Sequence, residues 1–321
     1  MNKGKTQIDR LLSEGSVSQD FLYDEVRCDY TVTTFMKKVW AIELDLLKEF
    51  DRVCKKHHLK YYVYGGTLLG AARHKGFIPW DNDIDVIMMR SEYNRLCDIA
   101  PLEFKSPYFL QTHYSDFGAT WGHAKLRNSE TTCISNLDTK YERTINQGIF
   151  LDIFPADNVI DDERLFNKQK KYADFYRINA KRFAMATKES YRWHSNKLKD
   201  FVYKILIKLS GSLNRKISIY CWTKFEEECQ RYNNTETKFF SILSFQFSKK
   251  WMQSWEDYKS VTYLPFEFIN VPACSNYDHA LSMVYGDWHK FVRGGSQHEG
   301  FSFDPDHSYK MFFENINNSE K

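Results

Sequence analysis

The stretch that decides the fold is residues 64–90, YGGTLLGAARHKGFIPWDNDIDVIMMR. A β-prone run ending at Tyr64 meets a pair of glycines, and a helix-compatible segment then continues to His74. Gly76 and Pro79 end that helix, and the β-branched side chains that follow predict a second strand. The stretch therefore predicts a strand, a tight turn, a helix and another strand, which is the beginning of an α/β domain.

Two carboxylates lie at the start of the second predicted strand. Side chains two residues apart on a strand point to the same face, so Asp83 and Asp85 are expected to lie side by side. Neighbouring carboxylates favour a divalent cation, and oxygen ligands with open positions suit Mg²⁺, or Mn²⁺ in its place. An acidic turn at the surface would have the same residues and is the alternative.

The turn before the helix has the composition of a phosphate-binding loop. Gly65, Gly66 and Thr67 stand where a strand meets a helix, and backbone N–H groups at a helix start are anion ligands. An ordinary strand-to-helix turn is the competing interpretation. A phosphate-binding turn followed by a carboxylate pair is nevertheless a specific combination, because a nucleotide with its metal ion needs both.

Residues 64–90 closely resemble the signature of the LicD family of phosphocholine-type transferases, which is also similar to the catalytic region of fukutin-related protein. The resemblance covers roughly residues 35–310 and is strongest at the front. The further matching pieces are Lys125-Leu126-Arg127 before Thr131-Thr132, Phe150 to Pro155, Tyr285-Gly286-Asp287 and Ser296-Gln297-His298.

The resemblance implies a nucleotidyltransferase fold in which a third carboxylate completes the metal site, and Asp152 occupies the matching position. An Asp within an apolar strand is costly unless it is paired or bound to metal, although it could also cap the turn at Pro155. We expect Asp83 and Asp85 to be metal ligands, and Asp152 to be the third ligand or the general base that deprotonates the acceptor hydroxyl. Asn82 stands where the family usually has a third consecutive Asp.

Several cations are candidates for contact with the donor phosphates. Arg73 and His74 close the helix after the glycine turn, and Lys125 and Arg127 share one face of a predicted strand, so either pair could hold a diphosphate leaving group. Solvated surface charge is the alternative for each pair. His298 matches a C-terminal family histidine that could contact phosphate or acceptor, or it has a structural role.

The whole chain is expected to form an α/β fold (α+β), with a nucleotidyltransferase-like mixed sheet flanked by helices and a helical, basic C-terminal half. Apolar residues three or four apart predict a helix over residues 35–57. The expected division is an irregular arm (1–30), a catalytic core (31–160), a helical and aromatic-rich region that completes the cleft (161–314) and a disordered tail (315–321).

Positive charge gathers in one part of the predicted helical region. Residues 166–217 contain about fourteen Lys or Arg against three Asp or Glu. An apolar stripe flanked by lysines runs from Leu198 to Leu209, and either an anionic membrane surface or the protein's own core would match it. We favour core packing for the stripe. No known binding module accompanies the charge, which argues against a nucleic acid partner.

Cysteine usage and the lack of apolar runs bear on location. The seven cysteines are scattered without a C-x-x-C pair, which argues against a disulfide framework and for a reducing compartment. The first residues lack the apolar segment of a signal peptide, and no run approaches the roughly 20 apolar residues of a membrane span. We therefore expect a cytoplasmic protein, which could be peripheral at the inner face of the membrane.

Together these features predict a metal-dependent phosphotransferase. The expected donor is CDP-choline or another CDP- or CMP-activated compound, and the acceptor is a sugar hydroxyl of a glycan that could be lipid-linked. Phosphoethanolamine, aminoethylphosphonate and polyol phosphate are other candidate head groups. Nucleotide transfer, such as adenylylation, is the second hypothesis, and a catalytically silent subunit that binds glycan or membrane is the third.

Overall fold

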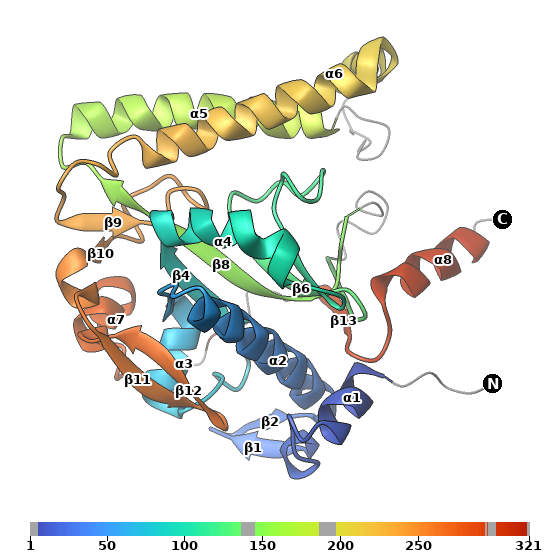
Figure 1. Ribbon diagram of the computed structural model, residues 1–321, viewed down its shortest axis with the longest axis vertical. Helices are drawn as coiled ribbons and strands as arrows, with labels where there is room; N and C mark the ends of the chain where they lie inside the picture. The colour runs from blue at the N-terminus through green and yellow to red at the C-terminus, as the bar shows by residue number, and fades with distance from the viewer. Residues whose placement is uncertain (1–5, 136–144, 186–196, 293, 295–299, 320–321) are drawn as a thin grey trace.

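The computed structural model describes residues 6–135, 145–185, 197–292, 294 and 300–319, and its centre is a seven-stranded mixed sheet (Figure 1). The central strand, β8 (Ile149–Val159), runs parallel to β4 (Asp85–Met89) and antiparallel to β6 (Ala124–Asn128) and β9 (Phe239–Ser241). The remaining strands of the sheet are β3 (Tyr62–Val63) beside β4, β5 (Tyr108–Gln111) beside β6, and β10 (Gln253–Ser254) beside β9. The expected α/β class with a mixed sheet flanked by helices is confirmed.

Helix α2 (Thr34–Lys56) packs on β8 and β6, which confirms the helix predicted from the apolar spacing. The Thr33 side chain caps its start by accepting a hydrogen bond from the backbone N–H of Met36. Trp40 lies on the buried face, and its Nε1 donates to the carbonyl oxygen of Asp81 at 2.9 Å. The helix therefore fixes the acidic loop that precedes β4.

The segment that decided the fold has the predicted order of elements. Helix α3 (Gly65–His74) follows β3, and β4 comes after the loop that contains Pro79. Helix α4 (Arg90–Glu103) follows directly. The helix begins at Arg90, because the chain leaves β4 without a connecting loop and Met89 takes the N-cap position.

The second half of the chain extends the same sheet and surrounds it. Strands β9 and β10 come from this half, so it completes the central sheet in addition to covering it. Its helices are α5 (Glu163–Met185), α6 (Lys197–Gln230), η2 (Trp255–Tyr258), α7 (Tyr277–Tyr285) and α8 (Tyr309–Ser319). Strands β11 (Val261–Phe266) and β12 (Ile269–Cys274) form a hairpin, and β13 (Phe301–Asp304) pairs with β7 (Thr132–Ser135).

The predicted irregular arm is wrong for most of its length. The segment contains α1 (Gln7–Ser13), η1 (Asp20–Leu22), and a hairpin of β1 (Glu25–Arg27) and β2 (Tyr30–Val32). A capping box between Thr6 and Asp9 starts α1, and Ile8 and Leu11 are buried where α1 packs on α2. Two buried apolar residues in a helix of seven are enough for this contact, and so short a helix leaves no sustained period in the sequence.

The predicted disordered tail is also wrong as far as Ser319, the last residue of α8. Tyr309 and Phe313 are buried against Ile134 of β7, so the first turns of this helix are held by apolar contact. A polar composition after residue 314 did not reveal that the segment continues a packed helix. Residues 320 and 321 lie outside the described residues.

Helices α5 and α6 form a long pair along one edge of the molecule (Figure 1). Ala173 and Ala180 of α5 and Phe225 of α6 are buried between this pair and the sheet. The expected core packing of the α6 stripe is wrong for the residues whose side chains are described, since Leu198 and Phe201 are 72% and 60% exposed. Among the described helices, none has both the length and the apolar content of a membrane span.

A buried ion pair joins α4 to the central strand and gives a test of the fold. Arg90 Nε and Nη2 donate to Asp157 at 2.8 and 2.5 Å, and Asn233 Nδ2 donates to the same carboxylate at 2.8 Å. We expect Arg90→Met to lower the free energy of unfolding by about 3–5 kcal/mol, because it leaves a buried carboxylate without its cation. Urea unfolding measures this loss. A loss below about 1 kcal/mol would show that water or other donors replace Arg90.

Candidate active site

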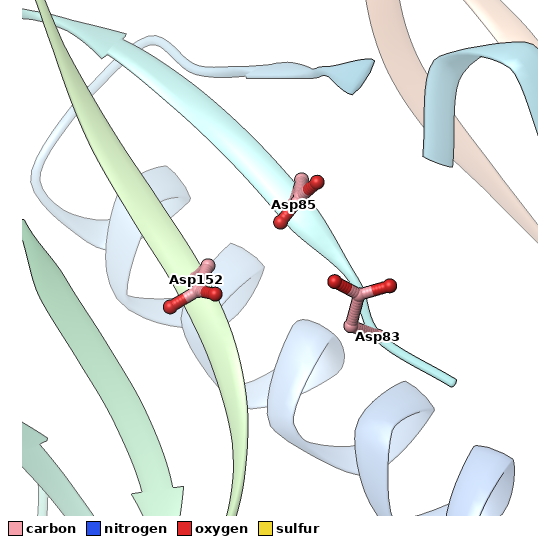
Figure 2. Close-up of side chains that lie close together, drawn as sticks. All are labelled: Asp83, Asp85 and Asp152. Carbon is pink, nitrogen blue, oxygen red and sulfur yellow. The ribbon is translucent and has the colours of Figure 1, made fainter. Parts of the chain in front are cut away.

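Three neighbouring strands place two carboxylates and a lysine in one row. The parallel register of β4 and β8 sets Asp85 beside Asp152, and the antiparallel register of β6 and β8 sets Lys125 on the other side of Asp152. Asp83 lies two residues before Asp85 on the same chain. Figure 2 shows Asp83 and Asp85 approaching Asp152 from the adjacent strand. The three aspartates that the sequence singled out therefore converge at one end of β4.

The geometry of these carboxylates fits a divalent cation. One oxygen from each of Asp83, Asp85 and Asp152 lies within 4.8 Å of the others, and Asp152 is buried while the other two are half-buried. An all-oxygen donor set with a solvent-accessible side is the kind of site that Mg²⁺ and Mn²⁺ prefer.

Asp152 is held in place by two basic side chains that approach the same oxygen. Lys125 Nζ donates to Asp152 Oδ1 at 2.5 Å, and His123 Nε2 lies 3.0 Å from that oxygen. Burial alone would raise the pKa of Asp152, but Lys125 and His123 hold it well below its usual range. Asp152 therefore stays ionised, and its other oxygen is left to face Asp83 and Asp85.

The remaining acids repel one another. Burial, and then the charges of Asp83 and Asp152, raise the pKa of Asp85 well above its usual value. Glu43 of α2 is buried near the same cluster, and burial, followed by the charges of the three aspartates and of Asp81, raises its pKa as well. Carboxylates crowded in this way bind a proton or a cation, so their arrangement fits a metal ion that neutralises them.

The glycine turn packs tightly against the acidic loop. Gly65 has a φ of +55°, and a Cβ there would lie 3.1 Å from Asp85 Oδ2. A Cβ at Gly66 would lie 2.7 Å from Asp81 Oδ2. A side chain at Gly65 would be strained by the positive φ, and a side chain at Gly66 would displace the Asp81 carboxylate, so glycine lets the start of α3 approach the carboxylates. Thr67 Oγ1 accepts a hydrogen bond from the backbone N–H of Asp85 at 2.8 Å, which ties α3 to β4.

A pocket of about 270 Å³ opens beside the carboxylates. Its polar lining comprises the three aspartates, Gly65, Gly66, His123 and Lys125. Its apolar lining is mostly aromatic, namely Tyr64, Trp121, Phe154, Phe245, Trp251 and Tyr285 with Ile242. Among the described residues, His123 Nδ1 and Trp121 Nε1 are buried and have no hydrogen-bond partner. Such groups at the edge of a pocket are available to a ligand.

Two of the predicted phosphate contacts lie elsewhere. Arg73 and His74 are at the opposite end of α3 from Gly65, about 13 Å along the helix axis. Arg73 Nη1 donates to the carbonyl oxygen of Trp288 at 3.1 Å, and burial followed by the charge of Arg73 lowers the pKa of His74 to about 4. The structure therefore does not bring this pair to the pocket. The prediction failed because the helix carries its C-terminal cations away from its N-terminus.

Arg127 shares a strand face with Lys125, as predicted, but makes different contacts. Arg127 Nε donates to Gln111 at 2.5 Å and Nη1 to the carbonyl oxygen of Gly148 at 2.7 Å. It is buried and does not line the pocket, so a direct contact with the donor is not supported. His298 lies outside the described residues.

The sequence missed His123, Glu43 and most of the pocket's rings. His123 lies two residues before Lys125, so the same alternation that paired Lys125 with Arg127 could have revealed it. Tyr285 lies in one of the matching pieces. Trp121, Phe245 and Trp251 come from loops without a periodic signal, and Glu43 is a single acid on an otherwise apolar helix face.

A mixed sheet with two carboxylates at the beginning of one strand and a third on the neighbouring strand, facing the start of a glycine-led helix, defines a nucleotidyltransferase-type catalytic domain. In agreement, residues 58–182 match the family described as "LicD/FKTN/FKRP, nucleotidyltransferase domain".

The chain is also similar to curated proteins. It is 30% identical over 252 residues to the lipopolysaccharide cholinephosphotransferase LicD of Haemophilus influenzae, covering 77% of this chain and 88% of that protein. Over 56 residues it is 41% identical to an uncharacterized protein of Rickettsia prowazekii, covering 17% of this chain and 21% of that protein. Over 60 residues it is 40% identical to one of Rickettsia typhi, covering 19% of each. The chain belongs to the LicD family and is a phosphotransferase of that type.

Proposed function

We propose that this enzyme transfers phosphocholine from CDP-choline to a sugar hydroxyl of lipopolysaccharide or of a related surface glycan such as a capsule. The convergence of Asp83, Asp85 and Asp152 beside a ring-lined pocket is the observation that supports this most. The name of the Haemophilus influenzae relative supports the same head group and acceptor.

In this proposal Asp83, Asp85 and Asp152 hold Mg²⁺, with Mn²⁺ as a substitute. When bound, the ion supplies positive charge that offsets the charge of the reacting phosphate. We assign Asp152 to metal binding rather than to proton abstraction, because the low pKa that Lys125 and His123 impose makes it a weak base. Lys125 and His123 are positioning residues that fix the Asp152 carboxylate.

The reaction exchanges the phosphoanhydride bond of CDP-choline for a phosphodiester bond to the sugar. The sugar oxygen forms a new bond to the choline-bearing phosphorus, the bond to the CMP oxygen breaks, and the hydroxyl proton passes to bulk water. Reactions of this kind depend mainly on positioning and on charge stabilisation. We propose that backbone N–H groups at Gly65 and Gly66, at the positive end of α3, bind the diphosphate.

The head group is assigned to the aromatic side of the pocket. Phe154 and Phe245 meet edge to face with ring centroids 5.3 Å apart, and Trp121 and Trp251 line the same space. Aromatic faces attract quaternary ammonium groups, and rings cannot satisfy the hydrogen-bond donors of a primary amine or a polyol. The lining therefore favours choline over phosphoethanolamine, aminoethylphosphonate or a polyol phosphate.

Truncating the ring at Phe245 tests this assignment. Phe245 is 44% exposed, so Phe245→Leu should change stability little. We expect the KM for CDP-choline to rise about 2- to 30-fold, the range of one cation–π contact, with a smaller change in the KM for CDP-ethanolamine. Steady-state kinetics with both donors measure the difference, and Phe268→Leu, also 44% exposed, is the matched control. Equal changes for both donors would contradict recognition of choline by this ring.

A thermal-shift panel with Mg²⁺ tests the donor class before any acceptor is known. We expect CDP-choline to raise the Tm more than CDP-ethanolamine, a CDP-polyol or ATP, because a ligand that binds only the folded state stabilises it. Stabilisation by ATP with none by a CDP- or CMP-linked donor would contradict the proposal and support nucleotide transfer.

We also propose that the reaction takes place in the cytoplasm, at the inner face of the membrane where a lipid-linked acceptor would be reached. The seven cysteines support a reducing compartment, because all of them are free in the structure.

A further inference from the structure

One face of α6 exposes large apolar side chains at its start and again near its middle, among the residues whose side chains are described. Successive helical residues are rotated by about 100°, so the exposed apolar residues between 198 and 220 fall within an arc of about 120°. They are Leu198 (72% exposed), Phe201 (60%), Val202 (47%), Ile205 (41%), Leu213 (54%) and Tyr220 (57%). We call these six residues the outer face of α6.

The outer face is opposite the side on which α6 packs. Ser218, Cys221 and Phe225 are buried, and Ser218 Oγ donates to the carbonyl oxygen of Ala180 in α5 at 2.8 Å. These buried positions lie about 180° from the outer face on the helical wheel. Within the described part of the chain, the helix therefore has two apolar sides, one buried and one exposed.

Positive charge accompanies the exposed apolar residues. From Lys197 to Lys216 the helix has six Lys or Arg and one acid, Asp200. Lys197, Lys199 and Lys204 are exposed beside the outer face, and Lys216 lies within its arc, where a long side chain can extend its ammonium group toward water. An exposed apolar face bordered by lysines is the pattern of a helix that lies in an anionic lipid surface.

We propose that the outer face of α6 docks this enzyme onto an anionic lipid membrane, with the helix axis in the plane of the interface. Phe201 and Ile205 enter the boundary between head groups and acyl chains, and the neighbouring lysines contact lipid phosphates. A second copy of the chain is a poorer occupant, because a two-fold contact across this face would bring its lysines together. The link to a lipid-linked acceptor rests on the proposed function, whereas the docking itself does not.

Sedimentation of the full chain with vesicles tests the docking. We expect binding to vesicles of phosphatidylcholine with 30% phosphatidylglycerol to exceed binding to pure phosphatidylcholine by about 10-fold or more, and to weaken as salt is added. Phe201→Ser with Ile205→Ser should reduce binding about 10-fold or more. The matched control is Val261→Ser with Tyr263→Ser, two exposed residues of β11 at 41% and 64%, and it should bind like the wild type.

Two further readouts separate the possible failures. The rate of transfer to a lipid-free glycan fragment should be the same for the wild type and both double variants. A failure of the proposed function would appear in this assay, whereas a failure of docking would appear only in the vesicle assay. Analytical ultracentrifugation reports whether the outer face joins two copies. No binding of the wild type to anionic vesicles, equal binding by the Phe201/Ile205 variant, or a dimer that this variant abolishes would overturn the proposal.

Discussion

Replacing Asp85 with Asn will reduce kcat/KM for phosphocholine transfer by about 10³-fold or more, since a metal that offsets phosphoryl charge supplies several kcal/mol to the transition state. Asp83→Asn is expected to have an effect of similar size, because both carboxylates face Asp152 at the end of β4. The measurement is initial-rate transfer from CDP-choline to a glycan acceptor at saturating Mg²⁺.

The same substitution should not weaken the fold. The pKa of Asp85 is raised by burial and by neighbouring carboxylates, so Asn removes a repulsion when no cation is bound. The Tm without metal should therefore be unchanged or higher, while the increase caused by Mg²⁺ should disappear. Asp161→Asn, at an exposed position after β8, is the control for both readouts. Normal turnover by purified Asp85→Asn would refute its role as a ligand.

Removing the cation at Lys125 is expected to have the second large effect. Lys125→Met leaves Asp152 with His123 alone, so the carboxylate loses one of the two contacts that fix it and keep it ionised. Mutation of a residue that hydrogen-bonds to a metal ligand typically lowers metal affinity or activity by about 10- to 100-fold. We therefore expect kcat/KM to fall by about 10²-fold. The Mg²⁺ concentration for half-maximal rate should rise with it.

Arg127→Met provides the matched comparison on the same strand face. Arg127 is also a buried cation, but it donates to Gln111 and Gly148 and not to Asp152. Both variants should lose stability, because Lys125→Met removes a cation from a buried carboxylate and Arg127→Met leaves two buried acceptors without their donor. Only Lys125→Met should change the Mg²⁺ dependence of the folded enzyme. An identical Mg²⁺ profile for the two variants would argue that Lys125 has only a structural role.

The sequence predicted the catalytic half of the fold well because its signals are local. The apolar spacing of α2, the glycine turn before α3 and the alternation around Asp83 and Asp85 each depend on neighbouring residues. The convergence of Asp152 with Asp83 and Asp85 required a parallel pairing of β4 and β8, which are distant in the sequence. It was reached through the family resemblance rather than through periodicity.

The failures have a common physical cause. Each failure depends on which surface an element meets in the folded chain. This holds for the folded segment from α1 to β2, for Arg73 and His74 at the far end of α3, and for the contacts of Arg127. The outer face of α6 shows the same limit. Its spacing predicted an amphipathic helix correctly, but spacing cannot tell whether the apolar stripe meets protein or another environment.

The central claim is that a metal ion held by Asp83, Asp85 and Asp152 supports transfer of phosphocholine. The most direct test uses two samples of CDP-choline, one labelled in the choline and the other in the cytidine. With Mg²⁺ and a glycan acceptor, the account predicts that the choline label enters the glycan while the cytidine label leaves as CMP, and that EDTA stops both. Cytidine label retained on the acceptor, or undiminished choline transfer in EDTA, would contradict it.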